Sequence, residues 1–176
     1  MKNKILVTYS TCTGSTKGVA EAIGKTLSDL GESVDVIQMS MVTDLSSYKA
    51  VVAGSAIQAG KWLPEAMSFI ELRKKELREK PFASFLVCMT LAMKKGESYR
   101  GTVSNWMQPV RDNVTPVSEG LFTGILDIKR LPTLNDRIKF RLSVLFGVWK
   151  EGDHRNWAAI KEWATDLNIK LKSGKL

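Results

Sequence analysis

Short apolar runs and longer stretches with helical periodicity alternate along the chain. The apolar runs predict β-strands, because strands covered on both faces lose the alternation of apolar and polar residues. Five such runs occur, at residues 4–9, 34–37, 50–57, 82–90 and 117–126. The run at 50–57 is almost uninterrupted, which is typical of a central parallel strand.

Amphipathic helices are predicted between these strands. In the first, Val19, Ile23 and Leu27 recur at i, i+4 and i+8, and Gly31 stands where a C-cap is expected. Further helices are expected at residues 62–80, at 99–113 with an interruption near Pro109, and after Asp153 as an N-cap. Because parallel strands need such crossovers, the sequence predicts an α/β fold with helices on both faces of a parallel sheet.

Residues 127–150 interrupt the short link expected between the fifth strand and the last helix. They hold six basic and two acidic residues, a net charge of +4, which is half of the +8 of the whole chain. An amphipathic helix is predicted there from the apolar residues Ile138, Leu142, Leu145, Phe146 and Trp149. Two interpretations stay open: a helix that covers the sheet edge, and an interface with an acidic membrane surface or an anionic substrate.

The composition is that of a globular protein. The 176 residues are 44% hydrophobic and 25% charged, and we expect one domain over residues 1–176. No apolar run is long enough for a spanning helix or a signal peptide. We therefore expect a cytoplasmic protein, with peripheral contact at the inner face of the membrane as a further option.

Few residues are suited to metal chemistry. Two distant cysteines, Cys12 and Cys88, and a single histidine, His154, give no support to a disulfide framework, a structural zinc or a His-rich metal site. No metal is expected. The net charge of +8 favours anionic partners without choosing among them.

The loop after the first strand combines hydroxyls, a glycine and the start of a helix. Thr11, Thr13, Ser15 and Thr16 offer hydroxyl donors, and Gly14 lets the backbone approach a ligand closely. The first N–H groups of a helix have no partner within it and attract anions. The spacing fits neither the nucleotide P-loop nor the dinucleotide glycine motif. The loop predicts an anion site, with an ordinary turn before a capped helix as the alternative.

This loop also resembles a known family. Residues 9–16, YSTCTGST, with Ala20 and Ile23 after them, resemble the signature of flavodoxins, whose loop binds the phosphate of FMN. Residues 52–62, 124–127 and 152–157 resemble the flavodoxin-domain branch that contains menaquinone-dependent protoporphyrinogen oxidase. The resemblance covers nearly the whole chain. It implies a flavodoxin-like three-layer fold with a five-stranded parallel sheet in the order 2-1-3-4-5.

The resemblance implies that FMN is held by the first loop at its phosphate and by two later loops at its isoalloxazine ring. The implied FMN-binding residues are Thr11, Cys12, Thr13, Gly14, Ser15, Thr16, Ala56, Ile57, Gln58, Ala59, Gly60, Lys61, Trp62, Thr90, Leu91, Ala92 and Gly96. Trp62 either stacks on the ring or packs in the core. Helix-end N–H groups would lower the pKa of the Cys12 thiol. No side chain demands the role of acid or base, so no catalytic residue is named.

The resemblance further implies an FMN-dependent oxidoreductase, in which a reduced substrate gives electrons to FMN and a quinone or a redox partner protein takes them up. One alternative is a flavodoxin-type electron carrier without a substrate of its own, and another is a domain that keeps the fold without flavin. Flavodoxin carriers are acidic, so a charge of +8 argues against the same basic partners. Nucleic acid is not expected, because no binding motif is present. The oligomeric state is left open.

Overall fold

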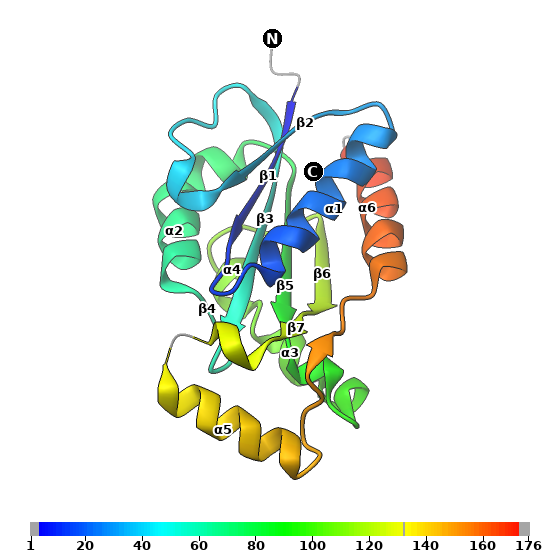
Figure 1. The fold of residues 1–176 in the computed structure, drawn as a ribbon. Coiled ribbons are helices and arrows are strands. Elements are labelled where there is room, and N and C mark those ends of the chain that lie inside the picture. Colours follow the sequence, from blue (N-terminus) through cyan, green and yellow to red (C-terminus); the bar gives the residue numbers. More distant parts are fainter. Residues whose placement is uncertain (1–3, 132, 173–176) are drawn as a thin grey trace.

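A parallel β-sheet lies at the centre of the computed structural model, which describes residues 4–131 and 133–172 (Figure 1). The parallel strands are β1 (Lys4–Ser10), β2 (Ser33–Gln38), β3 (Tyr48–Gln58), β5 (Phe82–Cys88) and β6 (Ser118–Thr123). They pair in the order β2-β1-β3-β5-β6, which confirms the predicted order 2-1-3-4-5 when the five are counted along the chain. A two-residue strand, β4 (Lys61–Trp62), pairs antiparallel with the end of β3.

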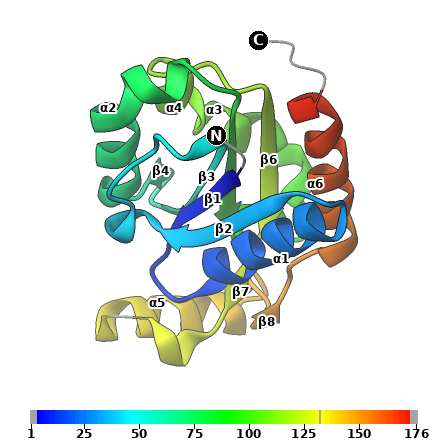
Figure 2. The same cartoon turned by 90° about the horizontal axis from the view of Figure 1, so that it is seen from above.

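Helices cover both faces of the sheet. On one face lie α1 (Ser15–Asp29) and α6 (Trp157–Lys172), and on the other lie α2 (Pro64–Arg78), α3 (Arg100–Asn105) and α4 (Gln108–Arg111) (Figure 2). Successive side chains of a strand point to opposite faces, so Leu6 joins the core under α2, whereas Ile5 and Val7 join the core under α1. The central strands are therefore apolar at nearly every position, which is the pattern that predicted them.

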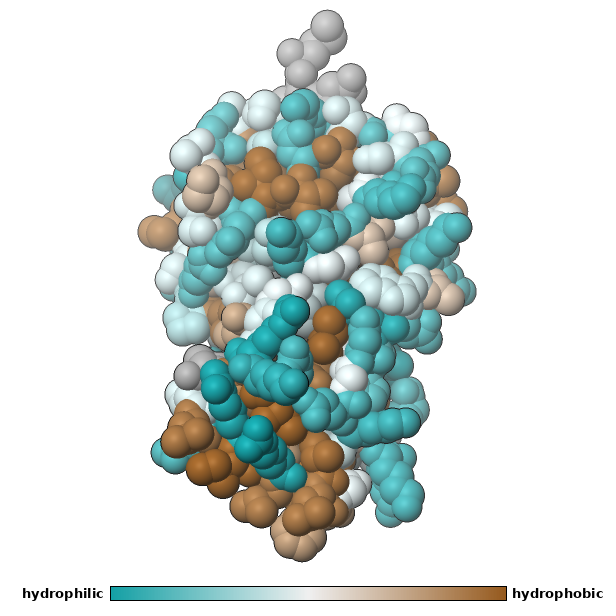
Figure 3. All heavy atoms as spheres, in the orientation of Figure 1, coloured by the Kyte–Doolittle hydropathy of each residue, from teal (hydrophilic) through white to brown (hydrophobic). Residues whose placement is uncertain are grey.

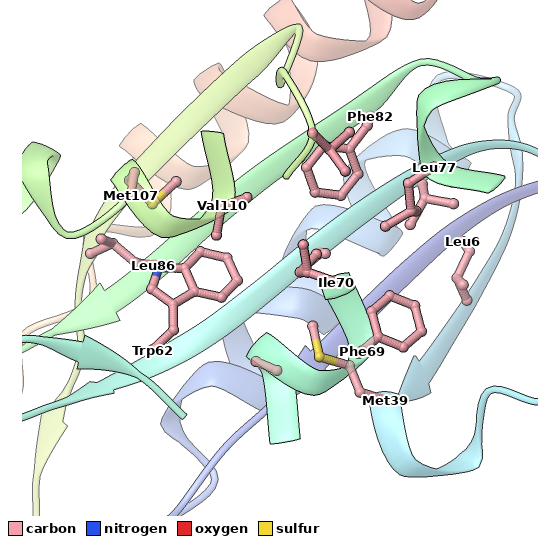
Figure 4. Packing of buried hydrophobic residues seen from close by; sticks show 14 of the residues in the cluster. Leu6, Met39, Trp62, Phe69, Ile70, Leu77, Phe82, Leu86, Met107 and Val110 are labelled. Atoms are coloured by element: carbon pink, nitrogen blue, oxygen red, sulfur yellow. The ribbon is translucent and has the colours of Figure 1, made fainter. Parts of the chain in front are cut away.

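Each face of the sheet has its own apolar core. Under α2, Phe69, Ile70 and Leu77 pack against the sheet (Figure 4). On the α1 side, the ring of Phe85 lies across Gly54. A Cβ at Gly54 would come 2.0 Å from Cζ of Phe85, so only glycine fits beneath this ring.

The fifth strand is shorter than predicted. It ends at Thr123, and Ile125–Leu126 form a separate strand, β7, that pairs antiparallel with β8 (Gly152–Asp153). The chain leaves the sheet at Gly124, whose carbonyl oxygen accepts a hydrogen bond of 3.0 Å from the backbone N–H of His154. A Cβ at Gly124 would lie 3.0 Å from Oγ of Ser15, so this bend passes close to the start of α1.

Two predicted helices also differ. The helix expected at residues 99–113 is a 3-10 turn, η3 (Gly96–Tyr99), followed by α3 and α4, because Pro109 lacks an N–H group and stands in the first turn of α4. The prediction that Asp153 caps the last helix is wrong. α6 begins at Trp157, and Oδ1 of Asn156 accepts a hydrogen bond of 3.0 Å from the N–H of Ala159. Asp153 instead pairs with Arg155 at 2.6 Å.

The insertion at residues 127–150 lies beyond the carboxyl ends of the strands and away from both faces of the sheet (Figure 1). It contains the 3-10 turn η4 (Ile128–Arg130) and the helix α5 (Leu134–Leu145), which ends before Phe146 and Trp149, two of the residues from which the helix was predicted. No side chain of α5 is buried, and Leu134, Leu145 and Phe146 are 72, 78 and 77% exposed. The interpretation as a cover for the sheet edge is therefore wrong.

The remaining short elements are the 3-10 turns η1 (Met39–Met41) and η2 (Thr90–Ala92). Within residues 4–131 and 133–172, no helix is both long and apolar enough to cross a bilayer.

Candidate functional site

A cavity of about 430 Å³ lies between the carboxyl ends of the strands and the insertion. Four segments line it: the loop after β1, the end of β3, the end of β5, and the chain from Gly124 into the insertion. The lining residues are Thr11, Cys12, Thr13, Ser15, Thr16, Ala56, Ile57, Gln58, Ala59, Val87, Cys88, Met89, Gly124, Ile125, Leu126, Leu131, Asp136, Phe140 and Trp149. Its volume is within the usual range for small-molecule and cofactor sites, roughly 300 to 1,000 Å³.

A second cavity, of about 700 Å³, lies at the opposite end of the sheet, beside Phe82 and the approach to β6. Two of its cationic side chains are already bound within the protein. Nε of Arg78 donates to the carbonyl oxygen of Asn113 at 2.7 Å, and Arg111 pairs with Glu119 at 2.6 Å. Ligands of open α/β sheets bind at the carboxyl ends of the strands. The smaller cavity is therefore the candidate site.

The loop after β1 leaves the amino end of α1 open toward this cavity. Gly14 is the N-cap residue, with φ 90° and no side chain to bind the N–H groups of the first turn. Its own N–H donates to Oγ1 of Thr11 at 3.1 Å, which holds the loop in its turn. The first turn of α1 has no acidic residue, so no negative side chain competes there for the helix N-terminus. This end of α1 is suited to an anion.

Thr16 and Ser15 add hydroxyls to the same place. Thr16 is fully buried, and its Oγ1 has no hydrogen-bond partner among the described residues. Such a hydroxyl costs free energy unless a ligand or water binds it. Oγ of Ser15 accepts a hydrogen bond of 3.0 Å from the N–H of Ile125, which leaves its proton free to be donated to a ligand. The predicted loop residues therefore fit a phosphate group.

The loop after β3 contributes only its first part to the cavity. Ala56, Ile57, Gln58 and Ala59 line it, whereas Gly60, Lys61 and Trp62 do not. Trp62 is 4% exposed and belongs to the core under α2 (Figure 4), which favours core packing over stacking on a ring.

At position 60, both the backbone conformation and a neighbouring side chain restrict which residue fits. It has φ 75°, and a Cβ there would lie 3.1 Å from Nε1 of Trp106. This position therefore favours glycine for structural reasons, whatever its relation to a ligand.

The loop after β5 turns away from the cavity sooner than predicted. Thr90, Leu91, Ala92 and Gly96 do not line it, and Val87, Cys88 and Met89 do. Residues 90–96 fold back on themselves through η2, and a Cβ at Gly96 would come 2.1 Å from the carbonyl oxygen of Leu91. Gly96 thus permits a close backbone approach inside the loop.

The insertion provides lining residues that the sequence analysis missed. Asp136 and Phe140 of α5 and Trp149 after it all line the cavity. The rings of Phe140 and Trp149 are paired, with centroids 6.0 Å apart and planes tilted by 50°. The apolar periodicity had pointed to α5, but it could not show which of its sides faces the strands.

The ends of the insertion are fastened to the sheet. β7 pairs with β8, and the N–H of His154 donates to the carbonyl oxygen of Gly124 at 3.0 Å. Oγ1 of Thr123 donates to the carbonyl oxygen of His154, and Nε2 of His154 lies 2.7 Å from the carbonyl oxygen of Lys150. His154 therefore has a structural role: its hydrogen bonds connect the end of the insertion to the end of β6.

Both cysteines lie at the cavity, and neither is an activated thiolate. Partial burial raises the pKa of the Cys12 thiol, so the prediction of a lowered pKa is wrong. Burial also raises the pKa of the Cys88 thiol.

Comparison with known proteins places the chain in a family. Residues 6–146 match the model of the flavodoxin domain. A protoporphyrinogen IX dehydrogenase [quinone] from Leishmania major is 27% identical over 174 residues, which cover 93% of this chain and 74% of that protein.

Solved structures share the fold. Oxidised flavodoxin 2 from Bacillus cereus has a TM-score of 0.58 and 19% identity, over 98% of this chain and 99% of that one. A flavodoxin from the domain Archaea has a TM-score of 0.52 and 21% identity, over 96 and 99% of the two chains. At such identities the likeness concerns the fold alone. The family model, in contrast, matches most of the chain, and the chain therefore belongs to the flavodoxin-domain family.

Proposed function

We propose that the protein is an FMN-dependent oxidoreductase that passes electrons from a reduced substrate to a quinone or a redox partner protein. One observation carries this proposal. In a chain of the flavodoxin-domain family, the buried hydroxyl of Thr16, which has no partner within residues 4–131 and 133–172, lies at the open end of α1 beside the cavity. Helix N–H groups and free hydroxyls are the donors that hold a phosphate without a cation.

Each segment of the cavity has a role in this proposal. Thr11, Thr13, Ser15 and Thr16 bind the phosphate together with the backbone around Gly14. The segments 56–59 and 87–89 orient the isoalloxazine ring at the ends of β3 and β5. When bound, FMN supplies the redox chemistry, and the protein supplies binding, orientation and a shielded site.

The position of the insertion favours an enzyme over a carrier. An electron carrier needs an exposed flavin edge at which a partner protein docks, whereas α5 and Trp149 lie over this cavity. The Leishmania relative, which nearly the whole chain matches, is described as a protoporphyrinogen IX dehydrogenase [quinone]. A porphyrinogen as the electron donor and a quinone as the acceptor are the substrate classes that this likeness supports.

Turnover tests the proposal. The purified protein, loaded with FMN, is given protoporphyrinogen IX and a menaquinone analogue, and the absorbance of the porphyrin product is followed. Steady formation of porphyrin that depends on both FMN and the quinone is expected. A flavin-loaded protein without turnover would favour the carrier, and a colourless protein that takes up no FMN would favour a domain without flavin.

We further propose that the insertion contacts an anionic membrane surface. Leu134, Leu145 and Phe146 are largely exposed, and residues 127–150 carry six basic side chains. Hydrophobic and hydrophilic residues lie side by side on this part of the surface (Figure 3). Exposed apolar and cationic side chains together are the combination that binds anionic bilayers peripherally. A quinone dissolved in lipid would then be close to the cavity.

Sedimentation with vesicles tests this contact. We expect the protein to bind vesicles that contain phosphatidylglycerol at low salt, and to bind pure phosphatidylcholine vesicles weakly. The double change Leu145→Ser with Phe146→Ser should abolish binding, whereas Leu72→Ser, at an 83% exposed position of α2, should not. Equal loss in both variants, or no binding by the parent protein, would refute the contact.

A further inference from the structure

The positive charge of the protein is absent from the described lining of the candidate cavity. The chain carries a net charge of +8 and the insertion +4, yet the described lining residues include no lysine and no arginine. Asp136 is the one charged residue among them. An anionic group inside the cavity, beyond the reach of the open end of α1, would therefore meet a carboxylate and no cationic side chain.

The basic side chains of the insertion are directed elsewhere. Arg130 pairs with Asp127 at 3.1 Å, and Nε of Arg137 donates to the carbonyl oxygen of Leu131 at 2.8 Å. Lys139 and Arg141 flank Phe140 in the sequence, but both are exposed and neither lines the cavity. Asp136 and Phe140 are four residues apart and therefore share the side of α5 that faces the cavity. The basic side chains of α5 do not line the cavity.

The wall of the insertion is also the aromatic part of the cavity. Phe140 and Trp149 are its only aromatic lining residues in the described part of the chain, and Leu126 and Leu131 are among its apolar lining residues. A tilted aromatic pair offers π-faces to a planar ring. The strand-end segments 56–59 and 87–89 contribute no aromatic side chain.

Asp136 is fixed in place by its neighbour. Its backbone N–H donates to Oγ1 of Thr133 at 3.0 Å, and Oδ2 of its carboxylate accepts from the same hydroxyl at 2.7 Å. This arrangement starts α5, and it leaves Oδ1 without a hydrogen bond to Thr133. A role in starting the helix alone would not affect which ligands bind.

We propose that Phe140, Trp149 and Asp136 form a selectivity wall that admits an uncharged planar ring as the second reactant and rejects an anionic one. The proposal rests on the proposed function, because it assigns the wall opposite the inferred FMN residues to the electron acceptor. Aromatic contact favours the ring of a quinone, and the Asp136 carboxylate disfavours a negative substituent on that ring. Carboxylates of a larger substrate would have to stay at the basic outer face.

Binding to the FMN-loaded, oxidised protein tests this wall without turnover. The probes are 2-methyl-1,4-naphthoquinone, which is neutral, and 1,4-naphthoquinone-2-sulfonate, which carries a negative charge, and calorimetry gives both dissociation constants. The parent protein should bind the neutral probe about tenfold more tightly. Asp136→Asn removes the negative charge, so it should increase the affinity for the sulfonate and narrow the affinity ratio about three- to tenfold. Asparagine is the suitable replacement because its amide keeps the shape of the side chain and the contact with Thr133.

The aromatic part of the wall has its own variants. Phe140→Leu and Trp149→Leu should each weaken the binding of the neutral probe about three- to tenfold. Phe146→Leu, at an exposed position, should leave this binding unchanged. The FMN dissociation constant, measured on the same proteins, should stay unchanged.

Three results would overturn the selectivity wall and leave FMN binding standing: equal affinities for the two probes, an unchanged ratio in Asp136→Asn, or a loss of FMN affinity rather than of quinone affinity in the aromatic variants. A parent protein that takes up no FMN would instead refute the proposed function.

Discussion

The hydroxyl of Thr16 is buried at the cavity and has no hydrogen-bond partner among the described residues. Valine has nearly the same shape without the hydroxyl. Thr16→Val should therefore raise the free energy of unfolding of the flavin-free protein by about 1 kcal/mol. The same change should also weaken the binding of FMN about tenfold or more, since a hydrogen bond to the phosphate is lost. Urea unfolding and fluorescence titration with FMN measure the two effects.

Thr8 provides the matched control. Its Oγ1 is also buried without a partner among the described residues, but Thr8 lies within β1 and does not line the cavity. Thr8→Val should raise stability similarly and leave the affinity for FMN unchanged. If Thr16→Val keeps the FMN affinity of the parent, the phosphate does not bind where we place it.

Cys12 gives a pH-dependent prediction from the same loop. Alkylation requires the thiolate, and a raised pKa means that the folded protein holds the proton to higher pH than the unfolded chain does. The rate of labelling by iodoacetamide should rise with a midpoint above the ordinary cysteine value of about 8.5. Mass spectrometry locates the label, and Cys12→Ser should remove it, because Cys88 is 5% exposed. A midpoint below 8.5 would mean that the end of α1 stabilises the thiolate after all.

Among the elements, α5 differs most from its neighbours in how it is held. α1 buries eight of its residues, whereas α5 buries none. The start of α5 is capped by Thr133, and Phe140 near its middle contacts the ring of Trp149. Helices without buried side chains open at little cost in free energy. Backbone amides of α5 should therefore exchange with deuterium about a hundredfold faster than those of α1. Mass spectrometry of peptic peptides measures this, and equal protection in the two helices would contradict it.

The strands of the sheet could be predicted from the sequence, but the ends of several strands and helices could not. The central strands were predicted because burial on both faces leaves a continuous apolar run, as at Val51 and Val52. The end of the fifth strand was missed because the bend at Gly124 depends on hydrogen bonds to His154, thirty residues later. Likewise, Asp153 and Asn156 are both good capping residues, and only the pairing of β8 decides between them.

One part of the candidate site was predicted from the sequence, and another part was missed. The loop at Thr11–Thr16 is local in sequence, so its residue types alone indicated an anion site. The wall made by Asp136, Phe140 and Trp149 depends on how the insertion folds back over the strand ends, which no short-range pattern encodes. The apolar stripe was read from Ile138, Leu142, Leu145, Phe146 and Trp149, and of these only Trp149 lines the cavity. The other two wall residues, Asp136 and Phe140, were not part of that stripe.

At the scale of the whole molecule, the basic side chains of the insertion are separated from the lining of the candidate cavity. The basic and apolar face of the insertion lies on the outside (Figure 3), and the cavity behind it holds no described cationic side chain. This separation is what our two proposals use: the outer face would contact an anionic surface, and the cavity would accept an uncharged ring. In our proposals, the fold supplies the phosphate end of the site, and the insertion supplies the end that selects the second reactant.

The measurement that tests the account most directly compares FMN with riboflavin, which lacks only the phosphate. The purified protein should be yellow and release FMN on heating, and the flavin-free protein should bind riboflavin about a hundredfold more weakly than FMN, because the contacts of the Thr11–Thr16 loop are lost. Equal affinity for the two flavins, or binding of neither, would contradict the claim that this loop is a phosphate site.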